Sequence, residues 1–349
     1  MTSQPQVTNH QMTDPQVLAP TTGSRSFSPA MIWHVLPWAI ALTFFFVGDG
    51  YHSLGTNILV MILFAMSLDL ALGYAGIITL GHAAFFGAGA YAAGIFAIHF
   101  NADPVLGLLV ATAVAGLLGL ITGMLILHTR GETLLMLTLA IAAIFYEVAN
   151  HARWLTGGDD GLSGIRVTPV FGLFRFDLWG KTAFLYSLSV LFIWFVIASL
   201  VVRSPFGRSL DGIRQNTKRM RAIGTPVWWR LVAMYALSAA MAGSAGALTA
   251  QSTRLVGLST LELLTSGIVA VMLVLGGERR LYGAFIGATI YVIVQDIAGS
   301  ISPFIWMFVI GFLLIIIVLF FEGGLMGIID SVVAKLKGKD RAQETGKPT

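Results

Sequence analysis

Four ionisable side chains stand inside otherwise apolar stretches of the sequence and are the first candidates for chemistry. Asp69 precedes, and His82 interrupts, a glycine-rich run (residues 73–94) that is too apolar for a surface loop and too rich in glycine for an ordinary helix. Glu147 lies near the end of its apolar stretch, and Asp296 stands beside a glutamine. Charged groups are unfavourable in apolar surroundings, so each is a candidate functional residue.

Asp69 and His82 each allow two interpretations. A break of this kind in membrane-spanning sequence usually marks the path of something that crosses. The carboxylate of Asp69 either lines such a path or, as we prefer, accepts hydrogen bonds from backbone N–H groups freed by the glycine-rich run. His82 follows a glycine at a point where a helix can restart, and a helix N-terminus attracts anions. This favours a carboxylate such as an amino acid as the solute; the alternative is that His82 caps or packs the break. The sequence around Glu147 and around Asp296 does not indicate a functional role for either residue.

Two short strings imitate enzyme motifs, and both fail on inspection. Residues 161–164 have the Gly-x-Ser-Gly pattern of a rhomboid-type intramembrane protease, which needs a histidine on a later helix, but the last histidine is His151. Residues 180–182 end like a P-loop, yet the first glycine of that motif would fall at Arg175. Cysteine is absent, which excludes thiolate and Cys-based metal chemistry. The sequence therefore predicts no catalytic residue, no metal site and no nucleotide or other cofactor bound by this chain.

The composition is that of a protein that crosses a membrane several times. Hydrophobic residues make up 56% of the 349 residues and charged residues 11%, against about 25% charged in soluble proteins. The net charge of +4 arises in connecting segments, where the positive-inside rule explains it without a nucleic-acid partner.

Apolar stretches bounded by Gly, Pro or charge predict an all-α polytopic fold with about ten transmembrane helices. The predicted helices are 31–47, 55–73, 83–100, 105–127, 133–150, 182–202, 231–251, 262–278, 283–301 and 303–321. Residues 73–82 are scarcely polar enough for a hairpin in water, which favours a broken or re-entrant segment. GxxxG spacing at 119–123 and 283–287, and small residues at 243–247, predict close helix packing.

The longest polar stretch between apolar segments is 203–230, which predicts an amphipathic helix. Phe206, Leu210, Ile213 and Met220 follow helical spacing on one face. Gly224 can end this helix, and the proline that follows prevents it from continuing. Such a helix either lies on anionic membrane lipid or docks to a partner protein.

Several motifs in order resemble the LivM-type permeases of bacterial branched-chain amino acid ABC importers, over most of residues 57–330. The motifs are Leu72-Gly73-Tyr74-Ala75-Gly76, Leu80-Gly81-His82-Ala83-Ala84-Phe85-Phe86-Gly87, Arg130-Gly131-Glu132, Thr156-Gly157-Gly158, Gly161-Leu162-Ser163-Gly164-Ile165, Phe206-Gly207-Arg208, Ile213-Arg214 and Leu237-Ser238-Ala239-Ala240 with Gly246-Ala247-Leu248. The resemblance implies a bacterial inner-membrane permease subunit that works with a second homologous permease, two ATP-binding cassette subunits and an external solute-binding protein. ATP would be hydrolysed by those partner subunits, so this chain is not expected to be an enzyme.

The resemblance also implies roles for particular residues. A short cytoplasmic helix should fit a groove of the ATPase, and its candidates here are Phe206, Gly207, Arg208, Leu210, Ile213, Arg214, Asn216, Arg219 and Gly224. Candidates for docking the solute-binding protein are Gly157, Gly158, Asp160 and Gly161, in a segment that a turn-rich loop explains equally well. Candidates for the substrate path are Asp69, Tyr74, Thr79, His82 and Phe85.

The chain departs from this family in two places. After Ile213-Arg214, where relatives carry acidic and alanine residues, residues 215–221 read Gln-Asn-Thr-Lys-Arg-Met-Arg, which predicts an acidic groove in the partner ATPase. Residues 276–280 replace a Gly-Gly-x-Gly pattern with Gly-Gly-Glu-Arg-Arg, and we assign that loop no role.

The resemblance implies branched-chain amino acids as the leading substrates; urea, short amides or aromatic acids are alternatives. The competing class is a self-sufficient secondary transporter or channel.

The expected organisation is a disordered cytoplasmic tail (1–30), a transmembrane permease domain (31–330) containing the cytoplasmic coupling segment 203–230, and a basic polar cytoplasmic tail (331–349). With both termini in the cytoplasm, sixteen of the 21 Lys and Arg residues lie inside and five outside. The positive-inside rule favours this orientation.

Cysteine labelling tests the orientation, because the natural chain has no cysteine to interfere. We expect Thr217→Cys to react with a membrane-impermeant thiol reagent only from the cytoplasmic side, and Asp160→Cys only from outside. The reverse pattern would overturn both the orientation and the assignment of the coupling segment.

Overall fold

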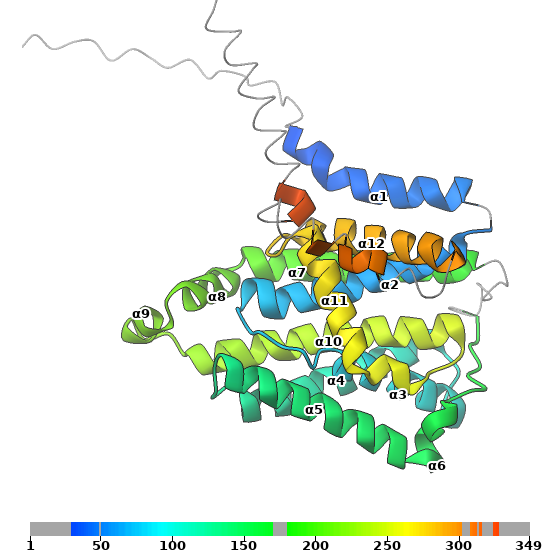
Figure 1. Ribbon diagram of the computed structural model, residues 1–349, viewed down its shortest axis with the longest axis horizontal. Helices are drawn as coiled ribbons and strands as arrows, with labels where there is room; N and C mark the ends of the chain where they lie inside the picture. The colour runs from blue at the N-terminus through cyan, green and yellow to red at the C-terminus, as the bar shows by residue number, and fades with distance from the viewer. Residues whose placement is uncertain are drawn as a thin grey trace, which may run out of the picture. The chain divides into compact units, whose positions relative to one another are not determined.

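A computed structural model describes residues 29–48, 50–169, 180–301, 308–312, 314–315 and 324–327 (Figure 1). The chain forms two compact units that divide after Ile40. The described part of the first unit is the beginning of helix α1 (Pro29–Val47), which contains Pro37. Most of the predicted helix 303–321 lies outside the described residues, and so do the predicted tails except for Pro29 and Ala30, which begin α1.

The second unit, over its described residues, is helical, and its β-structure is an isolated bridge between Leu162 and Val256. Its longer helices are α2 (His52–Asp69), α3 (Ala83–His99), α4 (Pro104–Ile126), α5 (Glu132–His151), α7 (Lys181–Arg203), α8 (Pro205–Gln215), α10 (Val227–Thr253), α11 (Leu263–Gly276) and α12 (Leu281–Ile301). The short elements are a π-helical turn (Leu70–Tyr74), α6 (Arg153–Thr156), α9 (Thr217–Ala222) and the 3₁₀ turns Gly158–Asp160 and Leu258–Leu261. These elements confirm the predicted all-α class.

Six of these helices are long and apolar enough to cross a membrane: α2 with its π-helical turn, α4, α5, α7, α10 and α12. Two predicted spans are shorter than expected. Helix α3 has 17 residues and α11 has 14, or roughly 26 and 21 Å at 1.5 Å per residue, below the roughly 30 Å of a bilayer core. Each follows a stretch without α-helix: residues 75–82 precede α3, and residues 254–262, which include the 3₁₀ turn Leu258–Leu261, precede α11. The number of about ten spans stays a prediction.

Helices α2 and α10 form the centre of this unit. In the most apolar 18 residues of each candidate span, 78% of the residues of α2 and 72% of those of α10 are buried inside the protein. The corresponding shares for α4, α5, α7 and α12 are 22–33%. Helix α10 packs against α2, α3 and α4, which Figure 1 shows beside it. The apolar residues on the outer helices remain available to contact lipid.

Glycine allows the central helices to approach closely. A Cβ on Gly89 of α3 would lie 2.3 Å from the carbonyl oxygen of Gly243 in α10, and one on Gly246 would lie 1.9 Å from the carbonyl oxygen of Phe86. The GxxxG pairs behave similarly, since Gly119 meets α10 and Gly287 meets the backbone of α11. The predicted role of these small residues in helix packing is confirmed.

A single methyl group tests this packing. Gly246→Ala should lower the free energy of unfolding by about 1–3 kcal/mol, because a backbone carbonyl would have to move away from the new Cβ. Gly267→Ala is the matched control, since a Cβ on this helical glycine would meet nothing within 4 Å. Thermal unfolding of the purified protein in detergent compares the two; equal stability would contradict the packing account.

Candidate functional site

The glycine-rich run breaks the helical backbone between α2 and α3. The π-helical turn (Leu70–Tyr74) follows α2, and residues 75–82 are non-helical up to the start of α3 at Ala83. Gly76 has a φ of +70°, a conformation that favours glycine. Side chains then alternate, with Ala75, Ile77 and Thr79 buried and Ile78 49% exposed. One side of this extended segment therefore packs on the protein and the other side is open.

His82 lies fully buried at the end of the break. Its Nε2 is 2.9 Å from the Ser67 hydroxyl of α2 and 3.5 Å from the Ser238 hydroxyl of α10. The Phe64 ring stacks on the imidazole at 5.8 Å, and the Phe85 ring meets it edge-on at 5.9 Å. His82 precedes the first residue of α3, and its side chain makes no capping hydrogen bond. These contacts agree with the alternative that His82 packs the break.

Two further helices hold the backbone of the break in place. The N–H of Ala83, at the start of α3, donates to the Ser266 hydroxyl of α11 at 2.9 Å. The N–H of Leu80 donates to the Thr138 hydroxyl of α5 at 3.3 Å, and a Cβ on Gly81 would lie 2.3 Å from the Thr138 carbonyl oxygen. The N-terminal ends of α3 and α11, the two short helices, therefore meet here.

Asp69 is fully buried and contacts a distant loop. Its Oδ1 accepts a hydrogen bond of 2.8 Å from the backbone N–H of Arg279, which lies between α11 and α12. The Tyr74 hydroxyl donates to the carbonyl oxygen of the same arginine at 3.0 Å. The carboxylate does accept a backbone N–H group, as preferred from the sequence, but this group belongs to residue 279 and not to the break.

The α11–α12 loop is the element that sequence reasoning missed. The Arg279 guanidinium pairs with the Asp211 carboxylate of α8, and its φ of +64° is unusual for a residue other than glycine. Arg214 of α8 donates to the carbonyl oxygen of Gly73 at 2.8 Å and lies 3.8 Å from the Glu278 carboxylate. Helix α8 is thus tied both to the end of α2 and to residues 277–280. We call this set of contacts the junction.

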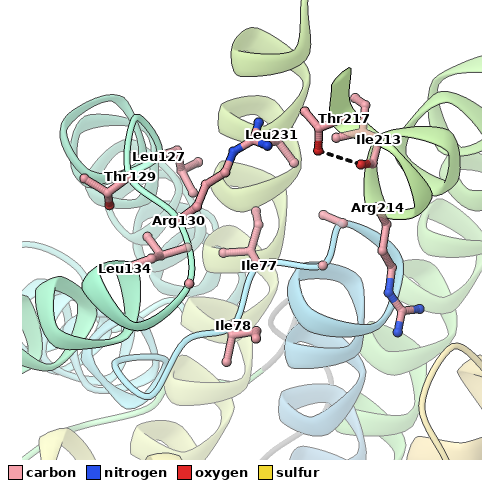
Figure 2. A pocket seen from close by; sticks show the side chains of 13 residues that line it. Ile77, Ile78, Leu127, Thr129, Arg130, Leu134, Ile213, Arg214, Thr217 and Leu231 are labelled. Atoms are coloured by element: carbon pink, nitrogen blue, oxygen red, sulfur yellow. Dashed lines mark hydrogen bonds between the residues drawn. The ribbon is translucent and has the colours of Figure 1, made fainter. Parts of the chain in front are cut away.

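The open side of the break faces a cavity of about 150 Å³ next to the junction (Figure 2). Its lining comes from residues 75–78, the α4–α5 connection with the start of α5, helices α8 and α9, and Leu231 of α10. Figure 2 shows the Arg130 side chain extending toward Leu231. The Arg214 side chain points away from Leu231 and from the centre of the cavity. Burial and the nearby Arg221 lower the pKa of Arg130. Arg130 therefore contributes a basic side chain to the lining of the cavity.

The prediction of a single helix over 206–224 is wrong in one respect. The structure has two helices there, α8 and α9, separated at Asn216. The side chain of Asn216 accepts the backbone N–H of Arg219 and starts the separate helix α9. An asparagine at a helix N-cap satisfies a backbone donor, and the break redirects the chain. Gly224 follows α9 with a φ of +81°, as expected for a residue that ends a helix.

The remaining coupling candidates divide between two surfaces. Leu210 and Ile213 are buried against the chain, and a Cβ on Gly207 would lie 2.3 Å from the Val202 carbonyl oxygen. Arg208 and the whole of α9, including Arg219, are exposed or half-buried. The apolar face of α8 is therefore occupied within this chain, and the basic surface of α9 is available to a partner.

The predicted docking residues for the solute-binding protein lie in a compact loop after α5 and α6. Gly157, Gly158 and Gly161 have φ values of +80°, +59° and +70°, and the bridge between Leu162 and Val256 closes the loop. Asp160 is exposed there. Residues 170–179 of the same connection lie outside the described structure.

The substrate-path candidates are mostly inaccessible in this conformation. Asp69, His82 and Phe85 have no exposed surface and Thr79 has 2%, while Tyr74 is half-buried. The exposed side of the break belongs to Gly76 and Ile78. Among the described residues no group of three His, Asp or Glu side chains lies close enough to hold a metal ion. Lining of a path by the predicted residues stays a prediction.

The comparisons with known proteins agree with each other. The family described as "Branched-chain amino acid transport system / permease component" matches residues 52–318. The high-affinity branched-chain amino acid transport system permease proteins LivM of Escherichia coli K12 and of Salmonella typhimurium LT2 are each 25% identical over 340 residues, which cover 89% of this chain and 77% of theirs.

A third relative is the probable branched-chain amino acid transport permease protein LivM of Methanocaldococcus jannaschii, 24% identical over 66% of this chain and 76% of its own length. No solved structure matches the chain. Because the family match includes the break, the junction and both central helices, the chain belongs to the branched-chain amino acid transport permease family.

Proposed function

We propose that the chain is the permease subunit of an ATP-driven ABC importer and moves branched-chain or related amino acids inward without changing them chemically. The single observation that carries this proposal is the junction, which ties an amphipathic helix outside the membrane spans to the break inside them. The membership of a transport permease family supports it.

The proposed importer divides its work among several chains. ATP hydrolysis belongs to two ATP-binding cassette subunits, delivery of the solute to an external solute-binding protein, and the second half of the membrane path to a homologous permease. Helix α9 supports this arrangement, because none of its residues is buried and it carries Lys218, Arg219 and Arg221. A partner with an acidic groove would complement this surface.

The orientation belongs to the same proposal. We place the chain in a bacterial inner membrane with both termini in the cytoplasm, so that α8, α9 and the cavity beside Arg130 face the ATPases. Residues 151–169 then face outside, where they are available to the solute-binding protein. The distribution of Lys and Arg along the sequence supports this orientation.

Movement of α8 would reach the membrane interior through short contacts. Arg214 bonds the carbonyl oxygen of Gly73 directly, and Asp211 reaches Asp69 through Arg279. Both routes end where α2 gives way to the extended segment 75–82. Non-helical backbone at membrane depth is tolerated where it is buried in protein or lines a water-filled cavity, and the open side of this segment fits the second condition. We therefore infer that the segment is a broken span beside the inward exit of the path.

Other solutes and another mechanism remain testable alternatives. Urea, short amides or aromatic acids would use the same architecture, with a different solute-binding protein. A self-sufficient secondary transporter or channel would need no ATPase at all. The dependence of transport on other subunits separates this last class from the proposal.

Reconstitution tests the proposal directly. The chain, purified together with the proteins that accompany it and placed in liposomes, should take up radiolabelled leucine only when ATP and the solute-binding protein are present. Uptake of urea under the same conditions should stay at background. Transport by the chain alone under an ion gradient would contradict the proposal and favour a secondary transporter.

The junction makes a separate prediction about coupling. Asp211→Arg or Arg279→Asp should each lower the leucine moved per ATP hydrolysed by at least about fivefold, because like charges would separate α8 from the loop. The double exchange should restore coupling, since the opposite charges return and aspartate tolerates a positive φ.

Arg254→Asp provides the control for this exchange. Arg254 is also an exposed arginine with a positive φ, of 57°, and lies at the end of α10 away from the junction. Its replacement should leave the coupling ratio unchanged. If the single variants at the junction behaved like Arg254→Asp, the junction would not transmit movement.

A further inference from the structure

A second hollow, far along α2 from the junction, contains polar side chains that the proposed function does not use. It lies between the beginning of α2 and the end of α12 and has a volume of about 520 Å³. Among the described residues, its polar groups come from Asn57, Gln295, Asp296 and Ser300, and its other lining residues are Leu54, Val292 and Gly299. We call it the polar hollow.

The polar hollow lies within two candidate membrane spans. On α12, the neighbouring Ile293 and Ile297 are 39% and 57% exposed and apolar, as expected of a surface that contacts lipid. Asp296 is exposed among them. An ionisable side chain within a span faces a water-filled space or a polar partner, because exposure to lipid is unfavourable. Water, a polar solute or a polar group of a partner subunit would satisfy the Asp296 carboxylate in the membrane.

The described part of the chain does not satisfy these polar groups itself. Ser300 donates its hydroxyl hydrogen to the carbonyl oxygen of Ile297 at 2.7 Å. The side chains of Asn57, Gln295 and Asp296 have no hydrogen bond or ion pair within the described residues. A carboxylate and two amides are thus left to bind a molecule that offers both donors and acceptors.

We propose that the polar hollow binds a zwitterionic amino acid by its α-ammonium group, an inference that rests on the proposed function and names the substrate contact. An ammonium group has three donors and no acceptor, and a charge-assisted bond to the Asp296 carboxylate is the strongest interaction the hollow offers. The amide N–H groups of Asn57 and Gln295 can donate to the substrate carboxylate. Leu54 and Val292 provide apolar surface for its side chain.

The size of the hollow favours a small solute over a contact between helices. Helices that associate in membranes do so through small residues and close packing, whereas this hollow has the volume typical of small-molecule sites. A Cβ on Gly299 would meet nothing within 4 Å, so a larger side chain can fill the space without displacing the protein. Gly299 thus keeps the hollow open.

Two variants of the reconstituted complex test this site. Asp296→Asn removes the charge at nearly constant shape, and Gly299→Leu fills the hollow. Asp296→Asn should lower ATP-driven leucine uptake at least about tenfold, the effect of losing a charge-assisted bond. Gly299→Leu should lower it by at least as much, because the new side chain would occupy the space of the solute. ATP hydrolysis without solute should stay unchanged in both variants. Glu147→Gln in α5 is the control for the loss of a charge, and Ile297→Phe is the control for added bulk on α12. Complexes with either variant should transport leucine normally.

The outcomes separate this site from the importer assignment. Leucine uptake by the unaltered complex tests the proposed function, whatever the variants do. Normal uptake by Asp296→Asn and Gly299→Leu would overturn the site. Loss of the second permease from the purified variant complexes would also overturn it, because the polar groups would then serve a contact between subunits.

Discussion

The structure depends on satisfying the backbone where the helical run of α2 stops, between the apolar helices α2 and α3. Lipid offers no partners to free N–H and C=O groups, so other parts of the protein must supply them. Two side-chain hydroxyl groups serve as such partners. The Thr138 hydroxyl accepts a hydrogen bond from the N–H of Leu80, and the Ser266 hydroxyl accepts one from the N–H of Ala83. These two bonds join α5 and α11 to the backbone at the start of α3.

The same requirement explains why the junction forms where it does. The end of α2 and the loop between α11 and α12 share hydrogen bonds through Asp69 and Tyr74, and α8 joins both through charged side chains. Asp69 Oδ1 is the buried group that fixes the loop through its backbone, while the Arg279–Asp211 pair is partly exposed. These contacts connect α8 to the break directly through Arg214 and indirectly through Arg279. The basic helix α9 has no buried residue.

Much of the fold was predictable because it is local. Hydropathy located the long helices, glycine content located the break, and small-residue spacing located close contacts such as Gly246 against α3. The split at Asn216 was missed because its apolar neighbours continue a helical period on both sides of the cap. The partner of Asp69 was not predictable, since Arg279 lies 210 residues away and the left-handed conformation of an arginine leaves no mark in the sequence.

Substitution of Asp69 tests the central claim most directly, because two variants separate hydrogen bonding from charge. Asparagine keeps an oxygen that accepts the Arg279 N–H, and leucine removes it. The measurement is the leucine moved per ATP hydrolysed by the reconstituted complex. We predict a ratio close to that of the unaltered protein for Asp69→Asn and a large loss for Asp69→Leu. An equal loss in both variants would contradict the account, because the carboxylate would then act through its charge and not by holding the junction.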